Sequence, residues 1–183
     1  MARIEPVDVD KLPEPYGSAY QEVMAGRTGP RINIHGTVGH SPGVLVRFVA
    51  LANELRNGTL LDPRLRELAI VTTSWTKGAD YEFAKHWNLA LSLGVRREQL
   101  EAIEAAADID TTPVFDDVER AVVRLAAEAV SNVRVSDATW AAAAAHLDER
   151  QLVELLMQIG LYSLTAHLTE AVQVDVESWF ERR

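Results

Sequence analysis

The feature that most constrains the fold is a helix-start signal that occurs twice in quick succession. Ser41-Pro42 precedes an apolar run that stops at Asn57-Gly58, and Asp62-Pro63 precedes another that stops at Lys77-Gly78. A capping residue followed by proline is typical of a helix start, and glycine just after the last periodic residue is typical of a helix end. The sequence therefore predicts two successive helices between these signals.

Apolar residues recur at helical spacing along the rest of the chain, so the predicted fold class is all-α. The β-branched run at residues 70–73 is assigned to a helix because it lies between a proline start and a glycine stop. Residues 1–36 are expected to form an N-terminal arm and a short helix, with a loop at 26–30, and residues 37–183 a single all-α domain. Further helices are predicted over 16–24, 83–93, 95–107, 115–131, 136–146 and 149–176, the last with a break near Gly160.

Composition limits the possible partners and the possible chemistry. The 183 residues carry 27 acidic and 18 basic side chains, a formal net charge of −9, and no run of lysine or arginine offers a basic face to nucleic acid. The first residues contain no apolar signal core, and no apolar run reaches the length of a membrane span. We therefore expect a cytoplasmic protein that binds neither nucleic acid nor membranes. The chain has no cysteine, which excludes disulfides, a thiolate nucleophile and cysteine-based metal sites.

Glu67, Glu82 and His86 are the strongest candidates for a chemical site. Glu82 and His86 are four residues apart, which places them on the same face of a helix. Glu67 lies fifteen residues before Glu82, on the preceding helix, across the turn at Lys77-Gly78. A histidine and two carboxylates beside a surface rich in tryptophan and leucine can perform acid/base chemistry.

A resemblance to a known family is carried by residues 61–103, which read LDPRLRELAIVTTSWTKGADYEFAKHWNLALSLGVRREQLEAI. The features are a proline-started helix with an Arg-Glu pair, a Tyr-Glu-aromatic-x-x-His segment, and an Ala-Leu-x-x-Gly-Val turn into a charged helix. This pattern, together with the helix entry at His40-Ser41-Pro42, resembles the carboxymuconolactone decarboxylase family, which is related to alkylhydroperoxidase D. The resemblance covers residues 40–105 and implies the alkylhydroperoxidase D-like helical fold.

In the peroxidase branch of that family, a glutamate is followed by Cys-x-x-Cys and then by a histidine four residues after the second cysteine. By spacing, the glutamate falls on Glu67 and the histidine on His86, while the two cysteines fall on Ala79 and Glu82. Peroxide reduction needs a thiolate and a resolving thiol, and this chain has neither. We therefore expect no thiol peroxidase activity, and the remaining residues resemble the decarboxylase-like branch.

The resemblance implies a cofactor-independent decarboxylase or a related proton-transfer enzyme that acts on a small carboxylated or lactone-like metabolite. We assign the catalytic roles to Glu67, Glu82 and His86, with His86 as the natural proton donor. An unsaturated lactone or a β-keto acid supplies its own electron sink, so we expect no cofactor and no metal. The residues that we expect to contact the substrate are Tyr81, Trp75, His40, Arg47 and Arg66.

Other interpretations of the same residues stay open at this point. Glu82 and His86 could be a solvated surface pair worth about 0.2–0.5 kcal/mol. Glu67 could be a solvated partner of Arg64 or Lys77. The three side chains could instead bind a divalent ion, or the chain could be a non-catalytic binding protein on the same fold. The histidines that we expect to be structural are His35, His146 and His167.

Several predicted helices, notably 44–55 and 83–93, are apolar over more than one face. This pattern favours burial against another subunit as well as against the core. The family resemblance also implies oligomers, either trimers or hexamers. We therefore expect a homo-oligomer that binds a small-molecule substrate.

Overall fold

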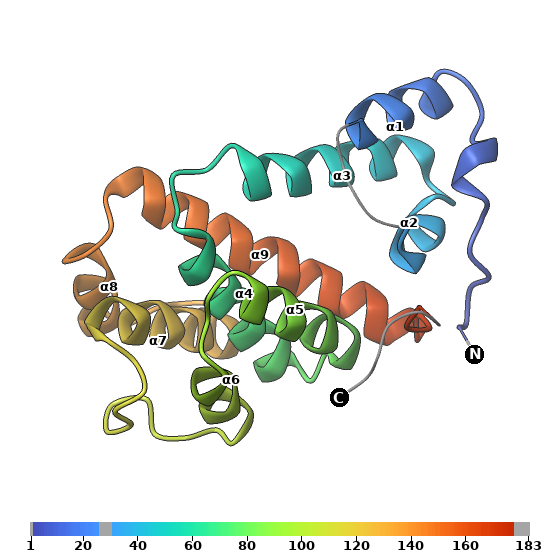
Figure 1. Cartoon of the computed structure of the whole chain (residues 1–183). Helices are drawn as coiled ribbons and strands as arrows, with labels where there is room; N and C mark the ends of the chain where they lie inside the picture. Colours follow the sequence, from blue (N-terminus) through green and yellow to red (C-terminus); the bar gives the residue numbers. More distant parts are fainter. Residues whose placement is uncertain (1, 26–30, 178–183) are drawn as a thin grey trace. The chain divides into compact units, whose positions relative to one another are not determined.

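A computed structural model describes residues 2–25 and 31–177 of the chain. Within these ranges the chain forms helices joined by turns and loops and has no strand, which confirms the all-α class (Figure 1). The loop predicted at 26–30 lies outside the described residues. The helices in chain order are η1 (Val9–Lys11), α1 (Tyr16–Met24), α2 (Asn33–Val38), α3 (Pro42–Asn57), α4 (Pro63–Lys77), α5 (Asp80–Ser92), α6 (Arg97–Glu104), α7 (Asp117–Asn132), α8 (Asp137–Ala144) and α9 (Glu149–Val172).

Both helix starts predicted from proline are present. α4 begins at Pro63 after Asp62, whose side chain accepts a hydrogen bond from the Arg64 backbone N–H at 2.7 Å. α3 begins at Pro42, but Ser41 occupies the N-cap position without a side-chain capping bond. α4 ends at Gly78, which has a left-handed backbone (φ 64°) that favours a residue without a Cβ atom.

Two predictions about the helices need correction. α9 runs without interruption from Glu149 to Val172, so the predicted break near Gly160 is wrong. A single glycine costs a helix only about 1 kcal/mol, which tertiary packing of a long helix can offset. The other correction is α2, which the sequence does not predict because its six residues include Gly36 and β-branched side chains of low helix propensity.

Contacts divide the chain into two units, of which the first comprises residues 1–58 and 169–182. In this unit α1 packs against α3 around the buried side chains of Tyr20 and Val49. The N-terminal arm holds α2, because the Val7 backbone N–H donates to the Gly36 carbonyl at 3.1 Å. A Cβ atom on Gly36 would lie 2.6 Å from the Cβ atom of Pro6. Tertiary contacts thus stabilise a short helix that its own sequence does not favour.

The second unit comprises residues 59–168 and has α4 at its centre. Residues 65–74 of α4 are all buried, and the helix packs against α5, α6 and α7. α8 packs against α7, and α9 contributes Leu155 and Ile159 to the same core. Because no face of this part of α4 reaches solvent, each of its polar side chains needs a partner inside the protein.

The predicted division into residues 1–36 and 37–183 differs from these two units and stays a prediction about domains. Among the described residues, no helix is both long and apolar enough to cross a membrane.

Candidate acid/base site

α4, the turn at Gly78 and α5 form a helical hairpin that brings the three predicted catalytic residues together. Glu67 lies on α4, and Glu82 and His86 lie one turn apart on α5. The exposed fractions of Glu67, Glu82 and His86 are 1%, 4% and 6%. This burial contradicts the interpretation of Glu82 and His86 as a solvated surface pair.

The centre of the site is a short hydrogen bond between Glu67 and His86. Glu67 Oε2 lies 2.7 Å from His86 Nδ1, and Glu67 Oε1 accepts a hydrogen bond from Arg66 Nε at 3.2 Å. Arg66 is also buried, so its charge compensates in part for the water that the carboxylate has lost. The interpretation of Glu67 as a solvated partner of Arg64 or Lys77 is therefore wrong.

The surroundings of Glu67 favour its ionised form. Burial raises the pKa of Glu67, but the charge and hydrogen bond of His86, followed by those of Arg66, outweigh that effect and bring the pKa below its ordinary value. Glu67 is therefore a carboxylate at neutral pH. Because a carboxylate can only accept hydrogen bonds, His86 donates from Nδ1. The ring nitrogen that is left to gain or lose a proton is Nε2.

Nε2 of His86 faces the second carboxylate of the site. Glu82 Oε2 lies 3.8 Å from His86 Nε2, which is longer than a hydrogen bond. A water molecule or a substrate atom can bridge polar groups at such a separation. One imidazole thus has a carboxylate on each side, hydrogen-bonded at Nδ1 and more distant at Nε2.

Tyr162 on α9 is a site residue that sequence reasoning misses. Its ring lies edge-on to the His86 ring, with the centroids 4.6 Å apart. The contact limits rotation of the imidazole and places α9 beside the site. No local sequence signal marks Tyr162, because it lies 76 residues after His86 in a helix that reads as apolar core.

Two of the predicted substrate contacts lie on the same hairpin but outside this cluster. Tyr81 is buried, and its hydroxyl accepts a hydrogen bond from Lys85 Nζ at 3.1 Å. Trp75 lies two turns after Glu67 on α4, about 12 Å along the helix axis. The Trp75 ring packs against Phe83 at a centroid distance of 5.0 Å and is 38% exposed. Arg66, the third such residue in this unit, contacts Glu67 instead of pointing to solvent.

The other two predicted substrate contacts belong to the first unit, where both are exposed. His40 Nε2 lies 2.8 Å from the Glu5 carbonyl oxygen. Arg47 donates to the Gly43 carbonyl, one turn earlier on α3, at 3.0 Å. Their roles in substrate binding stay predictions. Of the histidines expected to be structural, His35 Nδ1 lies 2.9 Å from the Tyr20 hydroxyl, while His146 and His167 are exposed.

The arrangement of donors does not favour a metal ion. Glu67 and Glu82 face different nitrogens of His86, so one ion bound to either nitrogen would lie on the far side of the ring from one carboxylate. In the described part of the chain, no group of three or more histidine, cysteine or acidic side chains is placed to hold a metal. The geometry is that of a hydrogen-bonded acid/base cluster.

A protein-family model matches the central part of the chain. The model of the carboxymuconolactone decarboxylase family matches residues 42–128, a range that includes α3 to α6 and most of α7 and contains Glu67, Glu82 and His86. A comparison with curated protein sequences gives no significant match.

Solved structures share the fold at low sequence identity. An uncharacterised peroxidase-related protein from Silicibacter sp. TM1040 superposes with a TM-score of 0.79 and 17% identity, over 98% of this chain and 93% of that one. The alkylhydroperoxidase AhpD core of a peroxidase-related protein from Ralstonia eutropha JMP134 gives 0.78 and 17%, over 98% and 94%. The debrominase Bmp8 in complex with 2,3,4-tribromopyrrole gives 0.76 and 18%, over 96% and 91%. These matches confirm the alkylhydroperoxidase D-like helical fold.

Proposed function

Because the carboxymuconolactone decarboxylase family model matches residues 42–128 and the chain has no cysteine, we propose that it is a cofactor-independent acid/base enzyme of that family. Its substrate is a small carboxylated or lactone-like metabolite, and its reaction is a decarboxylation or a related proton transfer. The observation that carries the proposal is the buried imidazole of His86 between two carboxylates, hydrogen-bonded to Glu67 at 2.7 Å.

Each residue of the cluster has a distinct task in this proposal. Glu67 holds the proton on Nδ1 and so fixes the tautomer and the orientation of His86. Arg66 keeps Glu67 ionised, and Tyr162 limits rotation of the ring. Nε2 of His86 is then the atom that exchanges a proton with the substrate, and Glu82 lies on that side to pass or receive the proton.

The proposed reaction needs no further reagent. In a decarboxylation the bond to the carboxylate carbon breaks, carbon dioxide leaves, and the electron pair enters the conjugated carbonyl of the substrate as an enolate. The protonated imidazole then delivers its Nε2 proton to carbon, and the neutral ring regains a proton from water. A flat, unsaturated ring suits this chemistry because it delocalises the electron pair, and the debrominase of similar fold binds a flat heteroaromatic ring.

The test is a substrate panel followed in deuterated water. Small unsaturated lactones that carry a carboxylate, together with β-keto acids, are incubated with the protein, and NMR follows both loss of the carboxyl carbon and deuterium incorporation at carbon. We expect turnover of at least one class, and loss of that turnover in His86→Ala. His146→Ala, which removes an exposed histidine of the same unit, is the matched control and should keep full activity.

The alternative function is that of a non-catalytic binding protein. Binding of a panel compound by calorimetry, without carbon–deuterium exchange and with unchanged affinity in Glu82→Gln, would favour this alternative. Turnover that appears only after a divalent cation is added would favour the metal-dependent alternative instead.

A further inference from the structure

The two kinds of reaction in the proposed function differ in their use of protons. A decarboxylation forms one C–H bond for each carbon dioxide released, so a proton must reach His86 from water in every turnover. A shift of a double bond breaks one C–H bond and forms another, so one base can return the proton that it removes. Glu67, Glu82 and His86 have exposed fractions of 1%, 4% and 6%. Burial of this kind favours a reaction that does not draw a proton from solvent.

The contacts of His86 leave one atom for this exchange. Glu67 Oε2 accepts the Nδ1 proton at 2.7 Å, so the proton that comes from a substrate can bind only at Nε2. Glu82 Oε2 lies 3.8 Å from Nε2, which is too far for a direct hydrogen bond. A substrate that occupies the space between these two atoms also excludes a bridging water. The proton on Nε2 then returns to the substrate.

The charges beside the two ring nitrogens also differ. On the Nδ1 side, the Glu67 carboxylate accepts from Arg66 Nε at 3.2 Å, so this arginine is directed away from Nε2. On the Nε2 side lies the Glu82 carboxylate. Two carboxylates can only accept hydrogen bonds and repel each other, so the position next to Nε2 favours an uncharged reacting group over a carboxylate.

These observations select one of the substrate classes that the proposed function includes. Resting on that function, we propose that the site acts on neutral β,γ-unsaturated carbonyl compounds, unsaturated lactones among them, and moves their double bond into conjugation with the carbonyl group. His86 is the acid and base of both steps, and Glu82 selects against a carboxylate at the reacting carbon.

The reaction is balanced within the site. Nε2 of the neutral ring removes a proton from the carbon between the carbonyl group and the double bond, and the C–H electron pair delocalises into a dienolate. The imidazolium that forms lies between Glu67 and Glu82, whose charges favour it. Nε2 then delivers the proton to the far carbon of the former double bond, and the carbonyl group forms again. One carbon separates the two reacting carbons, so Nε2 can lie about 3–3.5 Å from each on the same face.

The test compares two β,γ-unsaturated five-membered lactones, one without a carboxylate and one with a carboxylate on the ring. Ultraviolet absorbance follows conjugation, and NMR in deuterated water follows carbon dioxide release and deuterium at carbon. We expect the neutral lactone to be isomerised with kcat/KM about tenfold or more above that of the carboxylated one. Less than one deuterium should enter per turnover, since a buried Nε2 returns the proton that it removed. His86→Ala should abolish the shift, and His146→Ala, an exposed histidine, should keep it.

A second variant tests the selection by charge. Glu82→Gln should narrow the difference in kcat/KM between the two lactones, which a purely structural role of Glu82 would leave unchanged. An unchanged ratio, a shift that persists in His86→Ala, or one full deuterium per turnover would overturn the inference. Decarboxylation of the charged lactone without isomerisation of the neutral one would also overturn it and leave the proposed function intact. Failure of the folded protein to convert either lactone would contradict both.

Discussion

Glu67 and Glu119, two of the buried carboxylates of the second unit, are similar in burial and differ in their partners. Glu67 and Glu119 both have exposed fractions of 1% or less, and the pKa of each lies below its ordinary value. Each also contacts an arginine of α4, Arg66 and Arg64 respectively. One carboxylate belongs to the candidate acid/base site, and the other lies where α4, α6 and α7 meet.

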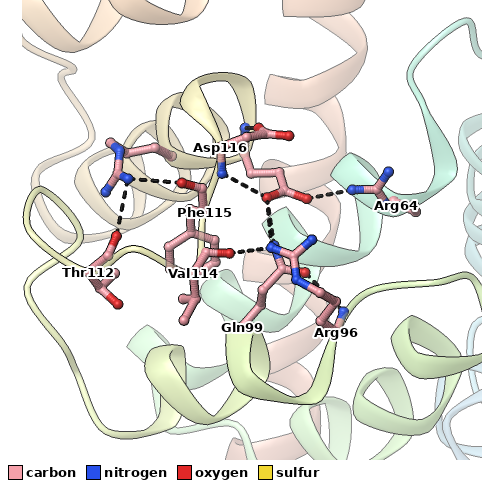
Figure 2. Close-up of polar contacts among 9 residues, drawn as sticks. Arg64, Arg96, Gln99, Thr112, Val114, Phe115 and Asp116 are labelled. Atoms are coloured by element: carbon pink, nitrogen blue, oxygen red, sulfur yellow. Dashed lines mark hydrogen bonds and ion pairs between the residues drawn. The ribbon is translucent and has the colours of Figure 1, made fainter.

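The partners of Glu119 are groups that hold their protons at neutral pH (Figure 2). Its Oε2 accepts from the Asp116 backbone N–H at 3.0 Å and from Gln99 Nε2 at 2.7 Å. The Glu119 backbone N–H donates to Asp116 Oδ1 at 2.8 Å, which closes a capping box at the start of α7. Gln99 also caps α6, because its Oε1 accepts from the Arg96 backbone N–H at 2.9 Å. Glu119 thus ties two helix starts together.

The main partner of Glu67 is the imidazole of His86, whose second ring nitrogen can exchange a proton with a substrate. The site also contains a second carboxylate, Glu82, which no helix start requires. Burial and a lowered pKa are common to Glu67 and Glu119, so neither property identifies a catalytic carboxylate. Only Glu67 is hydrogen-bonded to a side chain that can exchange a proton, and this difference distinguishes a carboxylate placed for chemistry from one that stabilises the fold.

The largest expected effect is a loss of turnover in variants of the candidate acid/base site, Glu67, Glu82 and His86, that leave the contacts of Glu119 intact. His86→Ala should lower turnover by about 10²–10⁴-fold, because it removes the proton donor. Glu82→Gln keeps the shape of the side chain and removes its charge, so any loss of turnover reports the need for the carboxylate. Both are measured as kcat/KM on a substrate found in the panel. Glu119→Gln should leave kcat/KM unchanged, and a comparable loss in that variant would contradict the separation of the two networks.

The sequence predicts those features of the two carboxylate clusters that depend on residues close together in the chain. Asp62-Pro63 and the glycine after Lys77 are signals within one turn of the helix ends, so α4 and the hairpin to α5 could be predicted. The four-residue spacing of Glu82 and His86 then placed them on one face, since the helical repeat alone decides that. Asp116 and Glu119 also have the spacing of a capping box, a readable signal for the second network.

Features that depend on distant segments could not be predicted in this way. Tyr162 reaches His86 from a helix far along the chain, and only tertiary packing decides which α9 residue faces the ring. α2 is another such case, because contacts with the N-terminal arm stabilise a segment of low helix propensity. The break predicted near Gly160 fails for the same reason, since propensity is weighed without the packing of the rest of α9.

The next largest expected effect is a loss of stability when the contacts of Glu119 are removed. Glu119→Ala leaves Gln99 Nε2, Arg64 and the Asp116 backbone N–H without their shared acceptor, so it should lower the free energy of unfolding by about 3 kcal/mol. Urea denaturation followed by circular dichroism measures this loss. Glu128→Ala, which removes a more exposed α7 carboxylate that accepts from Ser136 at the start of α8, is the matched control and should cost clearly less. Equal losses in the two variants would show that burial of Glu119 adds nothing.

A smaller effect appears in the pH dependence of stability. The pKa of Glu119 is lowered from the ordinary 4.5, since burial raises it but the Asp116 N–H, Gln99 and the two arginines lower it more. A carboxyl group with a lowered folded pKa stabilises the protein above the unfolded pKa, and this contribution is lost as the pH falls through the folded pKa. Below pH 4.5 the unfolding free energy should therefore decrease, by up to about 1.4 kcal/mol per pH unit for each such group. Glu119→Gln should flatten this slope relative to the unmodified chain.

The smallest expected effect is a shift of the pH–rate profile that distinguishes Arg64 from Arg66, two positions apart on α4. Arg66 is buried and lowers the pKa of Glu67, so Arg66→Gln should raise that pKa and move the acid limb of the pH–rate profile upward by up to about one unit. The Arg64 side chain is 39% exposed and contacts Glu119, so Arg64→Gln should cost at most about 1 kcal/mol of stability and leave the acid limb in place. Both profiles are measured as kcat/KM against pH, at the same ionic strength because salt screens the exposed pair more strongly.

The separation of the two networks requires the acid limb to move in Arg66→Gln only. A shift of equal size in Arg64→Gln would mean that the charge near Glu119 also reaches Glu67, and that one connected electrostatic network spans α4.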